Sequence, residues 1–328
     1  MSEPILTVDD LVVEYPKQGG WQAALRGVSI ALDAGESLGL VGESGSGKST
    51  LALAMLGLLP DSARVGGSVK VAGAEVVGAG AKVLNRIRGR EIGLVYQDAL
   101  VSLNPVRNVG GQITEVIRRH RPGTGRREAR TLAVEALGKV GITDPARRFS
   151  QYPHEFSGGM RQRVAIAMAL AAHPRLLVTD EVTTALDVTV QAQVLGLLTT
   201  LRSDSDMAMI VVSHDLDVVR GVTERVAVMY GGRIVETGPT AAVFAGPAHP
   251  YTAGLIASIP SIERPVISFI PGQPPTGQAG VSGCAFAPRC SLGRERAICH
   301  ESVPGLLPHA DPAAERRSAC HFSGEMPV

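Results

Sequence analysis

The residues that most directly indicate chemistry lie between Gly42 and Thr50. Their sequence, Gly-Glu-Ser-Gly-Ser-Gly-Lys-Ser-Thr, fits the pattern G-x-x-x-x-G-K-[ST] of a phosphate-binding loop (P-loop), with an apolar run before it and a helical pattern after it. The glycines let backbone N–H groups point at phosphate oxygens, and the following helix adds the positive end of its dipole. We expect Lys48 to reach the β- and γ-phosphates of a nucleotide and the Ser49 hydroxyl to ligate Mg²⁺. The predicted phosphate site comprises Gly42, Ser44, Gly45, Ser46, Gly47, Lys48, Ser49 and Thr50.

Two neighbouring acidic residues are candidates for the metal-binding and proton-accepting groups beside the phosphate site. Asp180 and Glu181 follow the apolar run that begins at Leu176. Because such a run is typical of a buried strand, its end delivers both carboxylates to the edge of a sheet. We expect Asp180 to serve Mg²⁺ and Glu181 to accept a proton from an attacking water, as a general base does in nucleotide hydrolysis.

These side chains need strands and helices to position them. Short apolar runs predict strands at residues 37–41, 92–96, 176–179 and 209–213. Apolar residues at helical spacing predict helices at residues 49–59, 112–119, 127–140 and 190–201. Strands that alternate with helices indicate a doubly wound α/β sheet. The stretch from 103 to 175 has helical periodicity with little strand signal, so we interpret it as a helical subdomain inserted into the α/β core.

Composition and length restrict the class of protein. The chain has 328 residues, of which 45% are hydrophobic and 19% charged, which excludes a disordered or fibrous chain. The formal net charge of +1 gives no indication of a nucleic-acid partner. We find no stretch long and apolar enough to cross a membrane and no secretory signal at the N-terminus, so we expect the chain to stay in the cytoplasm.

A change in composition marks a boundary near residue 238. Proline and glycine become frequent from Gly238 onward, as is typical of a loop-rich appendage. We therefore predict an α/β domain over residues 1–237 and a C-terminal extension over residues 238–328.

The C-terminal extension contains all four cysteines of the chain: Cys284, Cys290, Cys299 and Cys320. In a cytoplasmic protein, four thiols confined to one tail favour a metal site over disulfides. Their spacing lacks the paired C-x₂-C knuckles of common zinc sites. Thiolates can hold either Zn²⁺ or a [4Fe–4S] cluster, and unliganded packing thiols are a third alternative.

A further motif precedes the acidic pair by about twenty residues. The run Phe156-Ser-Gly-Gly-Met-Arg-Gln-Arg163 resembles the signature motif of ATP-binding cassette (ABC) ATPases. The resemblance implies a RecA-like P-loop nucleotide-binding domain that works as a dimer. A serine followed by glycines opens a helix whose N-terminus is a further anion site. The resemblance implies that this site acts in trans, on ATP held by a second subunit, through Ser157, Gly158, Gly159 and Met160.

Other residues match ABC elements in the expected order. Gln97 corresponds to the Q-loop glutamine, which in the family contacts Mg²⁺ and the lytic water, and Asp187 lies in a run that resembles the D-loop. His214 corresponds to the switch histidine that contacts the γ-phosphate, and Tyr15 to an aromatic that stacks on adenine, although an aromatic there is also often a core residue. The resemblance therefore implies an ATPase in which Lys48, Gln97, Glu181 and His214 are catalytic.

A narrower resemblance covers essentially the whole chain. The runs Gln97–Pro105, Val109–Glu115, Thr183–Gln193 and His249–Thr252 are similar to those of the ATPase subunits of oligopeptide, dipeptide and nickel importers. The run Phe-Ser-Gly-Gly-Met favours the D-type subunit. Cys-rich C-terminal segments in this family have been associated with an iron–sulfur cluster, so the resemblance favours [4Fe–4S] over zinc.

The importer resemblance implies a set of partners and a location. They are an F-type ABC ATPase, two transmembrane permease subunits and, indirectly, an extracytoplasmic solute-binding protein. The chain is expected at the cytoplasmic face of the cell membrane, in contact with the membrane only through the permeases. Import of oligopeptides or dipeptides is the leading hypothesis. The alternatives are nickel or metal-chelate cargo, and a soluble ABC ATPase of translation or DNA repair.

The sequence departs from the importer pattern at three positions. Val182 stands where the family usually has proline after the catalytic glutamate, Ala99 where proline usually follows Gln-Asp, and Thr179 where an apolar residue or alanine is common. None of the three removes a catalytic group. Loss of proline relaxes the backbone φ at residue 182, so we expect at most a modest change in the loop behind Glu181.

Overall fold

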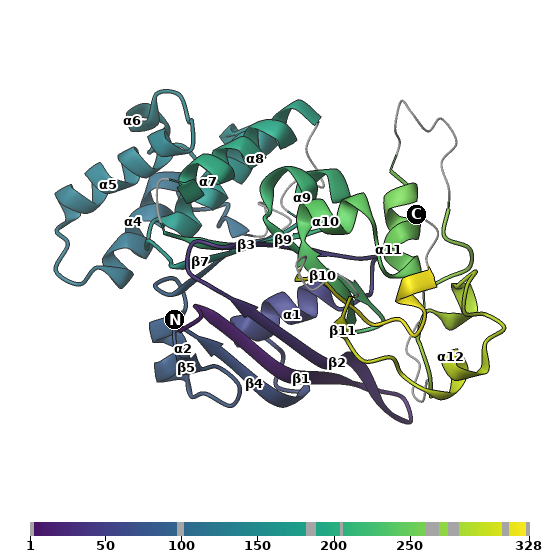
Figure 1. The fold of residues 1–328 in the computed structure, drawn as a ribbon. Helices are drawn as coiled ribbons and strands as arrows, with labels where there is room; N and C mark the ends of the chain where they lie inside the picture. The colour runs from purple at the N-terminus through teal and green to yellow at the C-terminus, as the bar shows by residue number, and fades with distance from the viewer. Residues whose placement is uncertain are drawn as a thin grey trace.

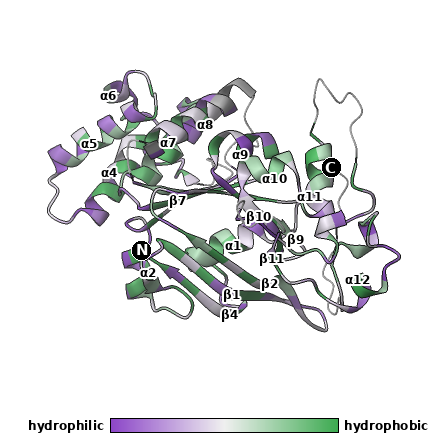
Figure 2. Cartoon of the chain, viewed as in Figure 1, coloured by the Kyte–Doolittle hydropathy of each residue, from purple (hydrophilic) through white to green (hydrophobic). Residues whose placement is uncertain are grey.

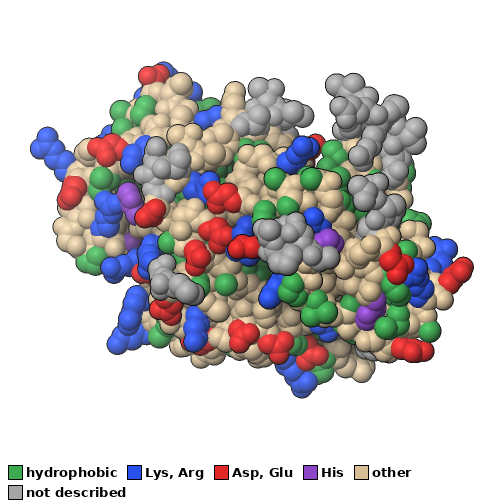
Figure 3. Space-filling model, in the orientation of Figure 1, with side chains coloured by type: hydrophobic (Ala, Val, Ile, Leu, Met, Phe, Trp, Pro, Cys, Tyr) green, Lys and Arg blue, Asp and Glu red, His purple; other side chains and the backbone are tan. Residues whose placement is uncertain are grey.

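The computed structural model describes residues 3–96, 102–181, 188–203, 206–259, 269–274, 282–309 and 315–325. Their strands form two sheets, one of four strands and one of eight. Helix α1 (Lys48–Met55) lies between the two sheets, and helices α7 (Gly158–Leu170) and α9 (Leu216–Val222) pack against the other side of the larger sheet (Figure 1). On the face drawn in Figure 3, Lys and Arg side chains lie among Asp and Glu side chains, in keeping with the small net charge.

The larger sheet confirms the predicted parallel core. Its parallel strands are β9 (Arg225–Tyr230), β3 (Ser37–Val41), β8 (Ala208–Ser213), β7 (Leu176–Asp180) and β6 (Ile92–Val95), neighbours in that order up to the edge of the sheet at β6. Every residue of β3 and β8 is buried, which is typical of strands covered on both faces. Because the strands are parallel, their carboxyl ends meet at one edge, where the loops after β3, β7 and β8 begin.

The smaller sheet is antiparallel and was not predicted from the sequence. It has the order β2 (Gly20–Leu32), β1 (Leu6–Lys17), β4 (Arg64–Val71) and β5 (Ala74–Glu75). The register of β1 against β2 shifts between Val8 and Leu11, and Asp10 there has a φ of 43°. This irregularity places two aspartates in mid-strand and interrupts the alternation of apolar and polar residues by which a half-buried strand is recognised.

Helix α1 is shorter than predicted. The spacing of Leu51, Met55 and Leu58 predicts a helix to residue 59, but the helix ends at Met55. Gly57 follows with a φ of 63°, a left-handed conformation typical of helix ends. Leu51 and Met55 are fully buried between the sheets, whereas Leu58 lies beyond the helix and is 38% exposed.

The predicted helical subdomain lies between β6 and β7. It contains α4 (Val109–His120), α5 (Arg126–Lys139), α6 (Pro145–Arg148), a 3₁₀ turn (Pro153–Glu155) and α7 (Gly158–Leu170). Figure 2 shows hydrophilic stretches on α5 and α6, which lie at the periphery. The apolar sides of α4, α5 and α7 join one core with the larger sheet. Helices α8 (Val188–Ser203) and α9 (Leu216–Val222) follow β7 and β8, as expected for a doubly wound sheet. Helix α2 (Ala81–Ile87) follows β5.

The C-terminal extension packs against the larger sheet. It begins with α10 (Thr240–Ala245) and α11 (Pro250–Ala257), and includes the 3₁₀ turn η2 (Ala287–Arg289), α12 (Ala297–Glu301) and a last 3₁₀ turn (Ser323–Glu325). Its strands β11 (Leu307–Pro308) and β12 (Arg317–Ser318) extend the sheet edge, where β12 pairs with β10 (Arg233–Pro239). The fully buried carboxylate of Glu236 in β10 accepts hydrogen bonds from the backbone N–H groups of Ala248 and His249, at 2.8 and 3.0 Å. No helix among the described residues combines the length and apolar character needed to cross a bilayer.

Candidate nucleotide-binding site

The P-loop connects β3 to α1, as its pattern predicts. Gly42, Gly45 and Gly47 have φ values of 151°, 79° and 109°, a region that favours glycine. A Cβ atom at Gly42 would lie 2.2 Å from the carbonyl oxygen of Met229, and one at Gly47 would lie 2.9 Å from that of Ala24. The loop therefore needs glycine both for its backbone conformation and for its close packing.

Two P-loop side chains have polar atoms in positions suited to phosphate. The buried Ser46 hydroxyl has no hydrogen-bond partner within the described parts of the chain, which fits a group that meets a ligand oxygen. The Lys48 ammonium donates to the carbonyl oxygens of Gly42 and Glu43, at 2.7 and 3.1 Å. Burial lowers the pKa of Lys48, although neighbouring carboxylates oppose the shift.

The two residues predicted to serve Mg²⁺ lie together. The Ser49 hydroxyl at the start of α1 donates to Asp180 Oδ1 at the end of β7, at 3.3 Å. Burial raises the pKa of Asp180, and the hydrogen bond from Ser49 acts in the opposite direction. A hydroxyl and a carboxylate are oxygen ligands of the kind that Mg²⁺ takes beside a bound nucleotide, so this pair fits the ion.

Glu181 and His214 also meet, although 33 positions separate them in the chain. The distance between His214 Nδ1, after β8, and Glu181 Oε1, after β7, is 3.3 Å. Glu181 has a φ of 47°, uncommon for a residue other than glycine, and its backbone N–H donates to the carbonyl oxygen of Val212 at 2.9 Å. Neighbouring strands thus present a carboxylate and a histidine at the same edge of the sheet. Thr179, one of the departures from the importer pattern, is buried and its hydroxyl donates to the Ile210 carbonyl oxygen at 3.4 Å.

The predicted signature motif begins a helix, as expected. Ser157 is the N-cap of α7, and its Oγ accepts a hydrogen bond from the Met160 backbone N–H at 3.4 Å. Ser157 and Gly158 are exposed, and Gly159 and Met160 are partly exposed. The motif is therefore accessible to a second molecule.

A cavity of about 610 Å³ opens beside the P-loop. It is lined by P-loop residues, by Glu181, by parts of β2 and β10, and by residues 283–286 and 303–306 of the C-terminal extension. The contribution of the extension was not predicted, because nothing in the local sequence relates it to a loop some 240 positions away. Tyr15 does not line this cavity; it pairs with Gln22 in the neighbouring strand and packs partly buried against the core between the two sheets.

Several predicted residues lie outside the described parts of the chain. They are Gln97 and Asp187, together with the departures Ala99 and Val182.

The four cysteines border a second, much smaller cavity. Its volume is about 10 Å³, room for about one water molecule, and its other walls include His249 and Phe286. Burial raises the pKa values of Cys284, Cys299 and Cys320, the last to about 11, and charge on neighbouring thiols adds to the shift. Four thiols suit a soft metal, but the described residues include no group of three or more His, Cys, Asp or Glu arranged to hold a metal ion. The thiols as they stand leave too little space for a [4Fe–4S] cluster.

Comparison with known proteins agrees with this geometry. A family model described as "ABC transporter" matches residues 25–184, and one described as "Oligopeptide/dipeptide transporter, C-terminal region" matches residues 235–299. A putative peptide import ATP-binding protein of Brucella melitensis is 47% identical over 322 residues, which cover 93% of this chain and 94% of the relative. The chain belongs to the ABC transporter family of ATP-binding proteins. The P-loop, Asp180 and Glu181 all lie within the region that the ABC model matches.

Other ABC proteins extend the comparison. The oligopeptide transport ATP-binding protein OppD of Mycobacterium tuberculosis is 45% identical over 320 residues, which cover 97% of this chain and 52% of the relative. The chain therefore spans about half the length of that relative. A solved dimeric ATP-binding cassette in a post-hydrolysis state with ADP and phosphate has a TM-score of 0.65 and 27% identity, over 72% of this chain and 98% of that one. The cassette CbiO1 of Clostridium perfringens has a TM-score of 0.63 and 28% identity, over 74% of this chain and 92% of its own.

Proposed function

We propose that this chain is the ATP-hydrolysing subunit of an ABC transporter that imports oligopeptides or dipeptides. The observation that carries the proposal is the meeting of the Ser49–Asp180 pair and the Glu181–His214 pair at the P-loop edge of the sheet. The peptide cargo is supported by the C-terminal match over residues 235–299 and by the printed names of the relatives.

Each residue of the site takes a role that follows from its chemistry. Lys48 and the P-loop N–H groups hold the phosphates of ATP. Ser49 and Asp180 would hold Mg²⁺, which when bound neutralises charge on the phosphate oxygens. Glu181 accepts the proton of the attacking water, and His214, 3.3 Å from it, orients that carboxylate and approaches the γ-phosphate.

The remaining predicted residues complete the proposal. The N-terminus of α7, with Ser157, Gly158, Gly159 and Met160, contacts ATP held by a second ATPase subunit, and the exposure of Ser157 supports this role. Gln97 contacts Mg²⁺ and the lytic water, and Asp187 passes between the two ATP sites. Tyr15 stacks on adenine, for which its ring would have to turn from the core towards the cavity wall at its strand partner Gln22. These three roles are carried over from the family resemblance.

The proposed assembly is the one that the importer resemblance implies. It contains an F-type ABC ATPase, two permease subunits and a solute-binding protein outside the membrane, with this chain at the cytoplasmic face and no nucleic-acid partner. We also propose the division into an ATPase domain, residues 1–237, and an extension, residues 238–328. The boundary falls within β10, which supports an extension that docks on the ATPase domain rather than one that moves freely.

We propose further that the four cysteines form one metal site. The convergence of the thiols on one cavity supports a shared site, and the family resemblance favours a [4Fe–4S] cluster over zinc. The thiol side chains would have to move apart to admit a cluster.

The function is tested by uptake in cells that lack the chromosomal copy of this chain. Wild type should restore uptake of a labelled tripeptide, and Glu181→Gln should not. The purified Glu181→Gln variant should still bind ATP while its hydrolysis falls by about 10²- to 10⁴-fold, the usual contribution of a general base. Glu135→Gln, a change at an exposed position of α5, is the matched control. Retained turnover in Glu181→Gln would identify another residue as the base, and restored uptake of nickel but not peptide would contradict the peptide cargo.

A further inference from the structure

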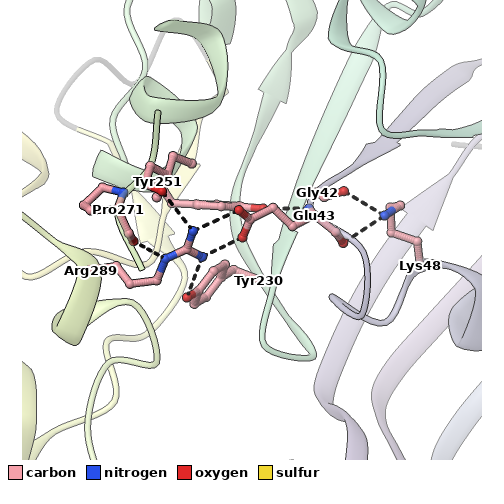
Figure 4. A network of polar contacts seen from close by, with 8 residues as sticks. Gly42, Glu43, Lys48, Tyr230, Tyr251, Pro271 and Arg289 are labelled. Carbon is pink, nitrogen blue, oxygen red and sulfur yellow. Dashed lines mark hydrogen bonds and ion pairs between the residues drawn. The ribbon is translucent and has the colours of Figure 1, made fainter. Parts of the chain in front are cut away.

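Two side chains of the C-terminal extension hold Glu43, the second residue of the P-loop (Figure 4). The Arg289 guanidinium donates to both carboxylate oxygens, with Nη1 2.6 Å from Oε2 and Nη2 3.0 Å from Oε1. The hydroxyl oxygen of Tyr251 accepts a hydrogen bond from the Glu43 backbone N–H at 2.7 Å. The extension therefore fixes both the side chain and the backbone of one P-loop residue.

The guanidinium is itself held in place. The Arg289 side chain is only 6% exposed, its Nε donates to the carbonyl oxygen of Pro271 at 2.8 Å, and its Nη1 donates to the Tyr230 hydroxyl at 3.2 Å. A bidentate pair with the remaining donors satisfied is the geometry in which a buried ion pair acts as a rigid link. The hydrogen bond to Glu43 raises the pKa of Arg289, so the guanidinium stays charged.

Tyr251 is equally fixed. It is fully buried, and its ring packs against Tyr230 and Phe286 with centroid distances of 4.5 and 5.4 Å. Its hydroxyl is thus presented to Glu43 by an aromatic cluster that belongs partly to β9 and partly to the extension.

The link continues to the phosphate-binding lysine. On the opposite side of the loop, Lys48 Nζ donates to the carbonyl oxygens of Gly42 and Glu43. Figure 4 shows Glu43 between Arg289 and Lys48. A displacement of Glu43 would therefore change the backbone that the lysine contacts.

We propose that Arg289 and Tyr251 are positioning residues for ATP binding, which hold the P-loop in its phosphate-binding conformation through Glu43. This inference rests on the proposed ATPase function. A loop that is already ordered loses less conformational entropy when it binds phosphate, so the extension raises ATP affinity without touching the nucleotide.

The test uses the full chain with Arg289→Lys, Glu43→Gln and Tyr251→Phe. Arg289→Lys keeps the positive charge but cannot form the bidentate pair. Glu43→Gln keeps the size of the side chain but removes its negative charge, and Tyr251→Phe keeps the ring packing but removes the hydroxyl. We expect the Kd for Mg·ATP, measured by calorimetry, to rise by about five- to tenfold in each variant. Amide hydrogen exchange at residues 43–46, measured without nucleotide, should become faster. Arg289 and Glu43 act through one shared contact. The double variant Arg289→Lys/Glu43→Gln should therefore have a Kd for Mg·ATP no higher than that of either single variant.

Arg296→Lys is the matched control. Arg296 lies in the same extension and pairs with Glu325 at 2.8 Å, but at the surface and away from the P-loop. This variant should change neither the Kd nor the exchange at residues 43–46. Unchanged affinity and exchange in Arg289→Lys and Glu43→Gln would overturn the inference. An equal increase in amide hydrogen exchange over the whole chain would also overturn the inference, because it would indicate a merely structural role. If wild type fails to bind Mg·ATP, the proposed ATPase function fails, and the exchange comparison still decides whether Arg289 orders the loop.

Discussion

At the scale of single residues, the four cysteines are the residues from which a metal site was predicted. All four thiols of the chain border one cavity, although Cys284 and Cys320 are 36 positions apart. Protein purified without oxygen should contain about four irons and four acid-labile sulfides per chain, the stoichiometry of the proposed cluster. Cys290→Ser should remove them, because serine replaces a soft thiolate ligand with a hard hydroxyl.

The measurement is metal and sulfide content together with the visible absorption spectrum. Ser282→Ala, a change in the same extension at an exposed position, is the control and should keep the metal. A content of one zinc per chain, without iron or sulfide, would contradict the cluster and identify the site as a zinc site. Absence of metal from wild type would contradict a metal site and leave the thiols as packing residues.

At the scale of elements, α11 depends on an unusual cap. His249 is the N-cap of this helix, and its Nδ1 accepts the Tyr251 backbone N–H at 3.0 Å. Complete burial lowers the pKa of His249 to about 3, so the folded chain keeps the imidazole neutral. The unfolded chain takes up a proton below its ordinary pKa of about 6.5. This group's contribution to the free energy of unfolding is therefore full above about pH 6.5. It is lost as the pH falls towards 3, with a slope of at most about 1.4 kcal/mol per pH unit.

We expect His249→Asn to reduce this pH dependence between about pH 6.5 and 5, since asparagine caps helices without titrating. The measurement is the free energy of unfolding in urea at several pH values. His154→Asn, a change at an exposed residue, should leave the slope as it is in wild type. An equal slope in wild type and His249→Asn would show that the histidine is not held neutral.

At the scale of the whole molecule, the extension shares its core with the ATPase domain. Phe286 and Tyr251 of the extension belong to the same buried cluster as Tyr230 of β9 and Val164 of α7. We therefore expect Phe286→Ala to lower the free energy of unfolding of the entire chain by about 3 kcal/mol, the usual cost of removing a buried phenylalanine.

The single tryptophan provides the measurement. Trp21 lies in β2, in the sheet farthest from α7, and its ring contacts Arg64. In Phe286→Ala, the unfolding transition seen by Trp21 fluorescence should shift together with the one seen by circular dichroism. Phe269→Ala, at a side chain that is 83% exposed, should shift neither. Two separate transitions in wild type would show that the extension unfolds on its own.

The sequence by itself determined the place of the P-loop in the fold and the parallel strands that carry it. A P-loop such as Gly42–Thr50 is a local pattern, and a strand such as β3 or β8 is a short apolar run, so both can be recognised from neighbouring residues. The meeting of Asp180 with Ser49 also follows, because the carboxyl ends of parallel strands share an edge. The antiparallel sheet was missed, since the irregular register near Asp10 breaks the alternation that identifies a strand.

Only the tertiary structure decided where the extension contacts the P-loop. The contact between Arg289 and Glu43 joins residues 246 positions apart. A shorter link, 13 positions long, joins the Glu236 carboxylate of β10 to the backbone N–H of His249. Neither contact can be recognised from a periodic pattern in the sequence, because each depends on how β10, β12 and the aromatic cluster pack once the sheet has formed. Local sequence patterns specify an element and its chemistry, whereas contacts between distant segments are set by the packing and ion pairing that only the folded chain provides.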